Sequence, residues 1–314
     1  MKTVITELNW AKGNEILTKV GEIIYDPDLW KKQDLPKVIQ DADVLIVRNQ
    51  TKVTRLLLQS APGLKVIGRL GVGLDNIDLQ AVKDRNIALV CAKNANSISV
   101  AEYVFAVMFT FARHPAEATV SVKQGYWDRK RYTGAEIYGK TLGLIGIGEI
   151  GTRIAIRANA FGMNIIGYDP FLPPYELATS DFGVKLASLE EVISCSDFIS
   201  LHVPLNKSTR YLINKQVLKL AKPTAIIINS ARGGVIDEKA LYEALVSGKL
   251  AGAALDVLER EPPLDSSLLE LNNIILTPHI AGLTEESQIK TSVMVAREVI
   301  KVLNGEPSSC LVNM

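Results

Sequence analysis

The chain contains 314 residues with a mass of 34.3 kDa, a length that predicts about two domains. Its 35 Lys and Arg side chains and 34 Asp and Glu side chains give a formal net charge of +1, which excludes the broad basic surface of a nucleic-acid-binding or membrane-surface protein. Apolar residues make up 47% of the chain and support a sizeable core. The three cysteines, Cys91, Cys195 and Cys310, show neither metal-site nor disulfide spacing, so we expect buried thiols in a reducing compartment.

The N-terminal residues 1–10 lack the charged and then apolar layout of a signal sequence. The most apolar stretch, residues 103–112, has about half of the ~20 residues that a membrane span requires. We therefore expect a soluble, cytoplasmic protein without nucleic-acid or membrane partners.

Short apolar, β-branched runs alternate with longer amphipathic runs along the chain, which predicts strands alternating with helices. Most of the short runs contain few polar residues, as expected of parallel strands covered on both faces. The predicted fold class is therefore α/β with doubly wound sheets. The predicted strands cover residues 44–47, 65–68, 87–90, 141–145, 165–168, 198–201, 225–229, 251–256 and 274–276.

Residues 96–113 interrupt this alternation with a nearly continuous apolar run. The run predicts a long buried helix, capped by Ser97 or Ser99 and with Glu102 in its first turn. A long helix in mid-chain is a candidate for the crossing between two domains.

Two further segments lie outside the simple alternation. Residues 124–138 are polar, basic and aromatic, which is typical of a projecting arm rather than of a core element. Residues 285–304 follow the last strand and predict a helix that returns to the first domain.

Residues 141–151 form a predicted strand that runs into a Gly-x-Gly-x-x-Gly motif. Gly146 permits a tight turn, Gly148 lets backbone amides approach a pyrophosphate, and Gly151 lets the next helix lie close to the strand. Asp169 ends the following strand, near the offset of about 20 residues expected of an acid that binds the ribose hydroxyls. An acid there repels the extra phosphate of NADP, which favours NAD. The alternative is a structural glycine turn followed by a surface aspartate.

Three later segments place polar residues after an apolar strand, where open α/β sheets bind ligands. These segments cover residues 228–237, 255–263 and 276–282. Interconversion of an alcohol and a ketone requires a group that exchanges a proton near neutral pH, a task that suits His279. Glu261 would favour a protonated imidazole, and Arg232 could hold a carboxylate through paired N–H bonds. Taken singly, each residue has a structural alternative: a satisfied histidine, a solvated loop glutamate and an arginine in a capped turn.

Several motifs keep one order along nearly the whole chain. They are GIGEIG at 146–151, YDP at 168–170, NSARGG at 229–234, Asp256 with EPP at 261–263, and TPHI at 277–280. With these motifs the chain resembles the D-isomer-specific 2-hydroxyacid dehydrogenases. The resemblance implies two Rossmann-like domains, with a NAD-binding domain at 98–285 inserted between two parts of a substrate-binding domain, residues 1–97 and the C-terminal helix of 286–314. An arm near 120–138 would pair two subunits into a homodimer, with a tetramer also open.

The resemblance also implies the site residues and their roles. Arg232 would orient the substrate carboxylate and carbonyl, His279 would be the acid/base, and Glu261 would pair with His279. No metal is implied. The residues implied to contact NAD are Gly146, Gly148, Glu149, Ile150, Gly151, Asp169, Val203, Pro204, Thr209, Ser230, Ala231, Arg232, Asp256, His279 and Gly282.

Two N-terminal loops resemble substrate loops of the family. Arg48 corresponds to a phosphate-contacting arginine, and Val72 and Gly73 would offer backbone amides to the substrate carboxylate. Arg69 would add charge, as would Arg129 or Lys130 from the arm of a partner subunit. A plain surface role near a turn is equally open for Arg48 and Arg69.

Within the family, the resemblance is closest to short members that oxidise 3-phosphoglycerate to 3-phosphohydroxypyruvate with NAD, in serine biosynthesis. The chain stops at Met314, so we expect neither the regulatory domain of longer relatives nor feedback by serine. Reduction of hydroxypyruvate or glyoxylate and oxidation of sulfolactate are alternatives in the same family. A NAD-sensing co-repressor is the alternative from another class, although such regulators add extended tails that this compact sequence lacks.

Overall fold

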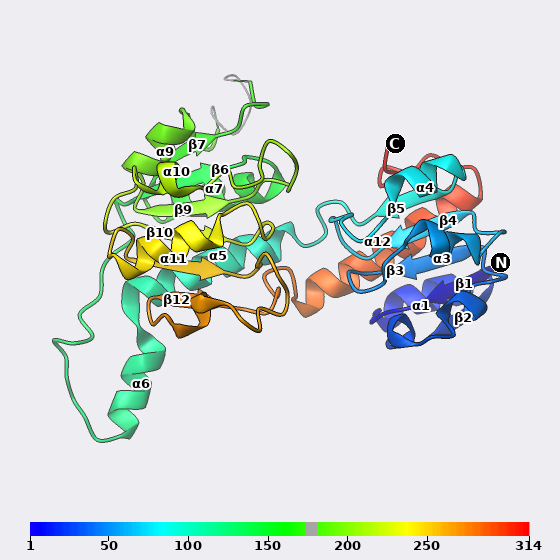
Figure 1. Ribbon diagram of the computed structural model, residues 1–314, viewed down its shortest axis with the longest axis horizontal. Helices are drawn as coiled ribbons and strands as arrows, with labels where there is room; N and C mark the ends of the chain where they lie inside the picture. The colour runs from blue at the N-terminus through cyan, green and yellow to red at the C-terminus, as the bar shows by residue number, and fades with distance from the viewer. Residues whose placement is uncertain (174–180, 314) are drawn as a thin grey trace. The chain divides into compact units, whose positions relative to one another are not determined.

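The computed structural model describes residues 1–173 and 181–313, and the chain divides into two compact units (Figure 1). One unit contains Met1–Asn96 together with Leu283–Met314, and the other contains Ser97–Gly282. The second unit is therefore an insertion in the sequence of the first. Both are α/β units built on parallel sheets, which confirms the predicted fold class.

The first unit has a five-stranded parallel sheet in the order β2-β1-β3-β4-β5. Its strands are β1 (Lys2–Ile5), β2 (Glu22–Tyr25), β3 (Val44–Val47), β4 (Val66–Arg69) and β5 (Ala88–Cys91). Its helices are α1 (Ala11–Thr18), α2 (Leu35–Val38), α3 (Arg55–Gln59), α4 (Leu79–Asp84) and α12 (Glu285–Leu303), with a 3-10 turn at Leu29–Lys31.

Apolar side chains cover both faces of this sheet. On one face Leu45 and Ile67 pack with residues of α3 and α4, and on the other face Ile46 and Val66 pack with residues of α1 and α12. Because alternate side chains of a strand point to opposite faces, each central strand must be apolar at successive positions. The run Val44–Val47 is fully buried for this reason.

The second unit has a seven-stranded parallel sheet in the order β12-β11-β10-β9-β6-β7-β8. Its strands are β6 (Thr141–Ile145), β7 (Asn164–Tyr168), β8 (Lys185–Leu186), β9 (Phe198–Leu201), β10 (Ile226–Asn229), β11 (Gly252–Leu255) and β12 (Ile274–Leu276). Its helices are α5 (Ser97–Arg113), α6 (Pro115–Lys123), α7 (Glu149–Ala160), α9 (Leu189–Cys195), α10 (Lys215–Leu218) and α11 (Glu238–Val246), with a 3-10 turn at Ser267–Glu270.

The strand order of the second unit reverses at β6, which pairs with β7 on one side and with β9 on the other. Helices α5 and α7 cover one face of the sheet, and α9, α10 and α11 cover the other (Figure 1). Ligands of open parallel sheets bind at such a reversal, beyond the carboxyl ends of the strands. The fold therefore places the candidate site at the ends of β6, β9, β10, β11 and β12.

The structure corrects several details of the sequence analysis. Strands β1, β2 and β8 were not predicted: β1 begins with the polar residues Lys2 and Thr3, β2 is a partly exposed edge strand, and β8 has two residues. Helix α5 starts at Ser97, so that residue belongs to the first turn and Glu102 lies beyond it. Cys195 is exposed, whereas the other two cysteines are buried as expected. Within the described residues, each helix is too short or too polar to span a bilayer.

Candidate functional site

The glycine-rich turn joins β6 to α7 at the reversal of strand order. Gly146 has a φ of +91°, and a Cβ there would lie 2.6 Å from the carbonyl oxygen of His202. A Cβ at Gly151 would lie 2.5 Å from the carbonyl oxygen of Gly146. Both positions therefore require glycine: the first for its backbone conformation and the second because α7 passes close to the turn.

Gly148 differs from the other two glycines because its φ is −78° and a Cβ at this position would meet nothing within 4 Å. It is the N-cap of α7 and provides no side-chain hydrogen bond to the first amides of the helix. Open space before the N-terminus of a helix of 12 residues suits an anionic group such as a pyrophosphate. Glu149, the first residue of α7, pairs with Arg153 at 3.1 Å, which offsets the negative charge of Glu149.

Asp169 lies directly after β7, next to the glycine turn. Its Oδ2 accepts a hydrogen bond from the amide of Ile147 at 2.9 Å, and its Oδ1 accepts one from the amide of Phe171 at 3.0 Å. The carboxylate thus ties the turn to the end of β7 and is fixed in direction. A carboxylate held at the end of the strand that follows the glycine turn and its helix is suited to accept hydrogen bonds from ribose hydroxyls.

Two buried polar atoms near the ends of β9 and β10 have no partner among the described residues. They are Nδ1 of His202 and Oγ of Ser230, which follow the paired residues Leu201 and Asn229. Burial lowers the pKa of His202 to about 3, so its imidazole is neutral, and its Nε2 lies 2.8 Å from Oγ of Ser200. Buried polar atoms normally find partners, so these two fit a polar group of a bound nucleotide.

His279 and Glu261 are brought together from two separate loops. Nδ1 of His279 lies 3.0 Å from Oε2 of Glu261, and both side chains are about 40% exposed. Burial raises the pKa of Glu261, but the hydrogen bond and charge of His279 and the charge of Arg232 outweigh it, and the net pKa is below the ordinary value. With Nδ1 directed at Glu261, Nε2 of His279 is the nitrogen that can exchange a proton with a substrate.

A buried network holds the backbone of His279. Asp256 is 1% exposed and accepts hydrogen bonds from the amides of Ile280 and Ala281, each at 2.7 Å, while its carbonyl accepts the amide of His279 at 2.9 Å. His279 has a φ of +58°, an uncommon backbone conformation that needs support from its surroundings. Asp256 supplies that support, in addition to being a predicted contact of NAD.

Sequence reasoning missed two residues of this network. Oγ1 of Thr277 donates to Asp256 at 2.5 Å, so its oxygen is left to accept the hydroxyl of Tyr103, which lies 2.7 Å away. Burial raises the pKa of Tyr103 to about 12, which keeps the phenol protonated as a donor. Thr277 belongs to the TPHI motif, but the motif alone indicates no role for it. Tyr103 sits in the apolar run of α5, and only its hydroxyl distinguishes it from core residues.

Arg232 lies in the loop after β10. Its Nη1 donates to the carbonyl of Ala231 at 2.6 Å, and Asn229 Nδ2 donates to the carbonyl of Arg232 at 2.9 Å. Gly233 follows, where a Cβ would lie 1.9 Å from the carbonyl of Leu258, so the arginine loop packs against the loop that carries Glu261. Arg232, Glu261 and His279 therefore come from three adjacent strand ends of one sheet.

The remaining predicted contacts of NAD lie on the same edge of this unit. Val203 and Pro204 follow β9, and Oγ1 of Thr209 donates to the carbonyl of Pro204 at 2.5 Å. Ile150 lies in the first turn of α7, and Gly282 is the last residue of the unit.

The predicted substrate residues Arg48, Arg69, Val72 and Gly73 all belong to the first unit. Arg48 follows β3, and its guanidinium makes no hydrogen bond or ion pair within the described residues. Burial lowers the pKa of Arg48, with Glu7 acting in the opposite direction. Arg69 ends β4 and donates to the carbonyl of Leu70 at 2.8 Å. Val72, which is 47% exposed, and Gly73 follow in an irregular loop.

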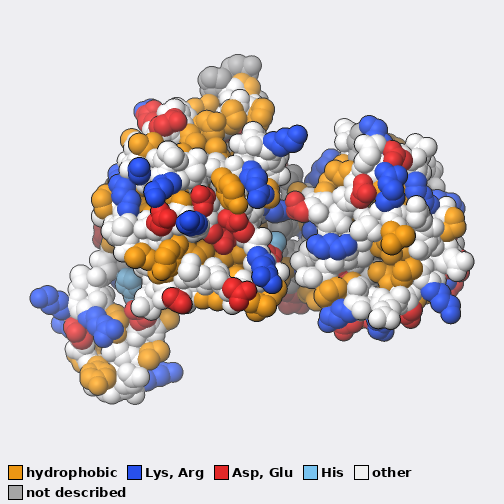
Figure 2. All heavy atoms as spheres, in the orientation of Figure 1, with side chains coloured by type: hydrophobic (Ala, Val, Ile, Leu, Met, Phe, Trp, Pro, Cys, Tyr) orange, Lys and Arg blue, Asp and Glu red, His pale blue; other side chains and the backbone are white. Residues whose placement is uncertain are grey.

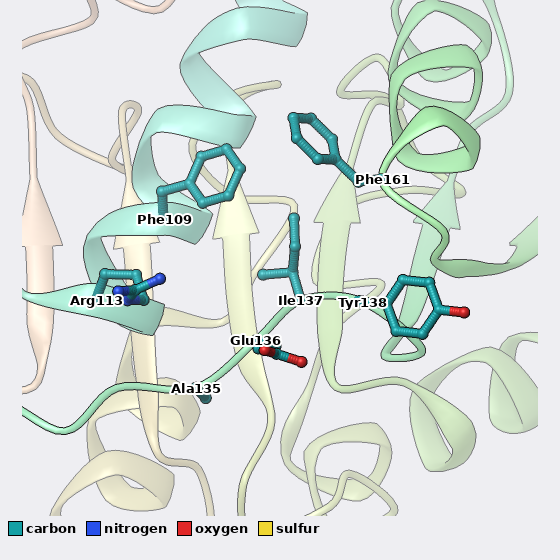
Figure 3. Close-up of a pocket in the computed structure, with 7 residues that line it drawn as sticks. All are labelled: Phe109, Arg113, Ala135, Glu136, Ile137, Tyr138 and Phe161. Carbon is teal, nitrogen blue, oxygen red and sulfur yellow. The ribbon is translucent and has the colours of Figure 1, made fainter.

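A separate pocket of about 390 Å³ lies beside the C-terminal part of α5 (Figure 3). It is lined by Phe109 and Arg113 from α5, by Phe161 after α7, and by the segment 135–138. None of the predicted catalytic residues lines it. Because the segment 135–138 is the end of the arm, this pocket belongs to the base of the arm and not to the nucleotide edge of the sheet.

A nucleotide turn and an acid–base pair on one edge of a parallel sheet are typical of dinucleotide-dependent oxidoreductases. Comparison with known proteins makes this class more specific. Residues 105–281 match the family described as "D-isomer specific 2-hydroxyacid dehydrogenase, NAD binding domain". The chain belongs to this family, and the second unit carries its NAD-binding domain.

Three relatives illustrate the range of the family. The chain is 51% identical over its whole length to D-3-phosphoglycerate dehydrogenase of Methanocaldococcus jannaschii, and spans 60% of that protein. It is 45% identical to hydroxypyruvate reductase of Thermotoga maritima, over 93% of the chain and 95% of the relative. It is 32% identical to D-lactate dehydrogenase from Aquifex aeolicus, solved with NAD and lactic acid, with a TM-score of 0.86 over 98% of the chain and 96% of the relative.

Proposed function

We propose that the protein is a NAD-dependent dehydrogenase of D-2-hydroxy acids, with 3-phosphoglycerate as its substrate. One observation carries the proposal: His279, Glu261 and Arg232 follow three adjacent strands of the sheet that also bears the nucleotide turn. The 51% identity to a D-3-phosphoglycerate dehydrogenase supports the choice of substrate.

The chemistry divides between the cofactor and the side chains. Bound NAD supplies the hydride acceptor, and the protein supplies orientation and proton transfer. In the oxidative direction, Nε2 of His279 takes the hydroxyl proton as C2 loses its hydride and the C2–O bond becomes a carbonyl. Glu261 stabilises the imidazolium through Nδ1, and Arg232 holds the substrate carboxylate.

Arg48 supports a substrate with a second anionic group. Its side chain is half-buried and makes no ion pair within the described residues. A partly desolvated cation without an anionic partner favours an anionic ligand, and a phosphate would supply the missing charge. A monoanionic acid such as lactate would leave Arg48 without a partner.

Reduction of hydroxypyruvate is the second candidate. It is favoured by the Thermotoga maritima hydroxypyruvate reductase, of which the chain covers 95%. That substrate requires the same His279, Glu261 and Arg232 but has no phosphate, so Arg48 would be dispensable.

Steady-state assays with purified protein test both candidates. The absorbance of NADH is followed with 3-phosphoglycerate, D-glycerate and sulfolactate in oxidation and with hydroxypyruvate in reduction. We expect the highest kcat/KM among the oxidised acids for 3-phosphoglycerate and a selective loss of this activity in Arg48→Gln. Absence of turnover with every acid would refute the dehydrogenase, and equal kcat/KM for 3-phosphoglycerate and D-glycerate would refute the phosphate-specific substrate.

We also infer that the arm pairs two copies of the chain. Helix α6 and the loop after it extend away from the sheet of the second unit (Figure 1), and hydrophobic side chains lie on their surface (Figure 2). Val120, Tyr126, Trp127 and Tyr138 are 56%, 65%, 78% and 74% exposed. Apolar side chains that gather on a projecting element are typical of an interface.

The oligomeric state can be measured by light scattering after size-exclusion chromatography. We expect twice the chain mass of 34.3 kDa for the wild type, or a multiple of that dimer, and a monomer for Trp127→Ala combined with Tyr126→Ala. A monomeric wild type would refute the pairing. A dimer would also allow Arg129 or Lys130 of one arm to reach the substrate of the other subunit. We further propose a cytoplasmic location, which the free thiols support.

A further inference from the structure

Glu7 is a buried carboxylate to which neither the sequence motifs nor the proposed mechanism assigns a role. It lies two residues after β1 and is 3% exposed. Its oxygens accept hydrogen bonds from four consecutive amides of another loop. The distances are 2.8 Å from Arg48, 3.1 Å from Asn49, 2.9 Å from Gln50 and 2.9 Å from Thr51.

Asn76 holds the carbonyl groups of the same loop. Its Nδ2 donates to the carbonyl of Arg48 at 3.2 Å and to that of Thr51 at 2.7 Å, and the asparagine is 8% exposed. Amides and carbonyls of the loop are therefore both bound to buried side chains. Since hydrogen bonds to a charged group are the stronger kind, Glu7 is the main restraint on the loop.

This arrangement separates the charge of Glu7 from that of Arg48. Each carboxylate oxygen accepts two amides, and the guanidinium of Arg48 makes no ion pair within the described residues. The two groups are close enough for Glu7 to favour the charged form of Arg48. Glu7 thus stabilises the cation without occupying its hydrogen-bond donors, which remain available to a ligand.

We propose that Glu7 is a positioning residue for the second anionic group of the substrate: it holds the loop of residues 48–51 so that Arg48 presents its guanidinium to a phosphate. The inference rests on the proposed function, since it assumes a dianionic 2-hydroxy acid. Preorganisation lowers the cost of ordering the arginine when the ligand binds. Glu7 acts through Arg48 and does not touch the reacting atoms, so its effect is confined to substrates that carry the second anion.

The test compares two substrates that share their C2 chemistry and differ in the phosphate, namely 3-phosphoglycerate and D-glycerate. In Glu7→Gln the side chain keeps its size, but one of its two oxygens becomes an NH₂ that faces two amide donors. We expect kcat/KM for 3-phosphoglycerate to fall at least tenfold, mainly through KM, while kcat/KM for D-glycerate changes less than about twofold. Arg48→Gln should give the same selective loss, and the double variant should lose little more.

Ile5→Val is the matched control. Ile5 lies in β1, is 0% exposed, and has an apolar side chain that makes no hydrogen bond to the loop. This change therefore weakens only the core of the same unit. We expect it to lower the thermal midpoint while changing the two kcat/KM values less than about twofold. If Glu7→Gln does not fold, Asn76→Ser carries the same test on the carbonyl side of the loop.

The outcomes separate this inference from the proposed function. A wild type without preference for 3-phosphoglycerate refutes the proposed substrate. A wild type with that preference, together with a Glu7→Gln variant that loses both activities equally or neither, overturns the positioning role. A selective loss of phosphate-bearing substrate, with a normal far-UV circular dichroism spectrum, supports it.

Discussion

Asp169→Asn removes one negative charge at the predicted ribose end of the cofactor site. Asp169 accepts two amides, from Ile147 and Phe171, and an asparagine retains one carbonyl oxygen for them. One hydrogen bond to the carboxylate is lost, a cost of about 1.5 kcal/mol, so we expect NAD binding to weaken about tenfold. The larger effect falls on the discrimination between NAD and NADP.

The magnitude of that discrimination follows from Coulomb's law. The 2′-phosphate of NADP carries about −1.5 to −2 charges at pH 7. Two unit charges about 5 Å apart repel by about 0.8 kcal/mol in water and about 3 kcal/mol at an effective dielectric constant of 20. Since Asp169 is partly exposed, we take about 1.5–3 kcal/mol, a factor of about 10 to 150.

Isothermal titration calorimetry with NADH and NADPH measures the two dissociation constants directly. We expect their ratio to change by about 10- to 150-fold in Asp169→Asn, in favour of NADPH. Glu190→Gln is the control, because it removes one exposed charge at the start of α9 in the same unit. A ratio that does not move in Asp169→Asn, or that moves equally in Glu190→Gln, would refute the ribose assignment.

The remaining predictions concern turnover and stability. Arg232→Lys loses the planar fork that holds a carboxylate, so kcat/KM should fall at least tenfold, about 1.4 kcal/mol; an unchanged value removes Arg232 from its role. Tyr103→Phe leaves Thr277 without its donor, so we expect kcat to fall about three- to tenfold with KM for NAD unchanged. A fall in kcat together with an equally large rise in KM for NAD would indicate a general structural role. Asp197 accepts the amide of Thr141 and pairs with Lys222, and although burial opposes it, its pKa is lowered. Because the pKa of Asp197 is lower in the folded state, its contribution to the free energy of unfolding is present when the pH is above the ordinary pKa. That contribution is lost as the pH falls through the folded-state pKa. Asp197→Asn should therefore lower the thermal midpoint at pH 7 but not near pH 2, and equal shifts at both values would contradict this.

Much of the site could be located from the sequence because its geometry depends on local backbone requirements. Position 146 needs a positive φ, and position 151 must leave room for the carbonyl oxygen of Gly146. Both requirements select glycine, which is visible directly in the sequence. Likewise, polar residues that end apolar strands must meet at one sheet edge, which brings Glu261 and His279 within 3.0 Å.

The residues that escaped prediction act through contacts between distant segments. Glu7 and the loop at residues 48–51 are separated by more than 40 positions, and nothing in the apolar pattern around Glu7 indicates four amide partners. Tyr103 fits the apolar face of α5, so its hydroxyl bond to Thr277, 174 residues away, has no sequence signal. Strand β2 was missed because edge strands lack the continuous burial on which the strand prediction relied.

Three acids in the two units share one physical role. Glu7, Asp169 and Asp256 lie just after parallel strands β1, β7 and β11, and each accepts two or more backbone amides of a loop. Amides bound in this way spread the negative charge over loop dipoles, so these carboxylates stabilise loops instead of forming ion pairs with arginines. A chain of nearly zero net charge can thereby keep Arg48 available for a dianion. The carboxylate of Glu7 already accepts hydrogen bonds from backbone amides and forms no ion pair with Arg48.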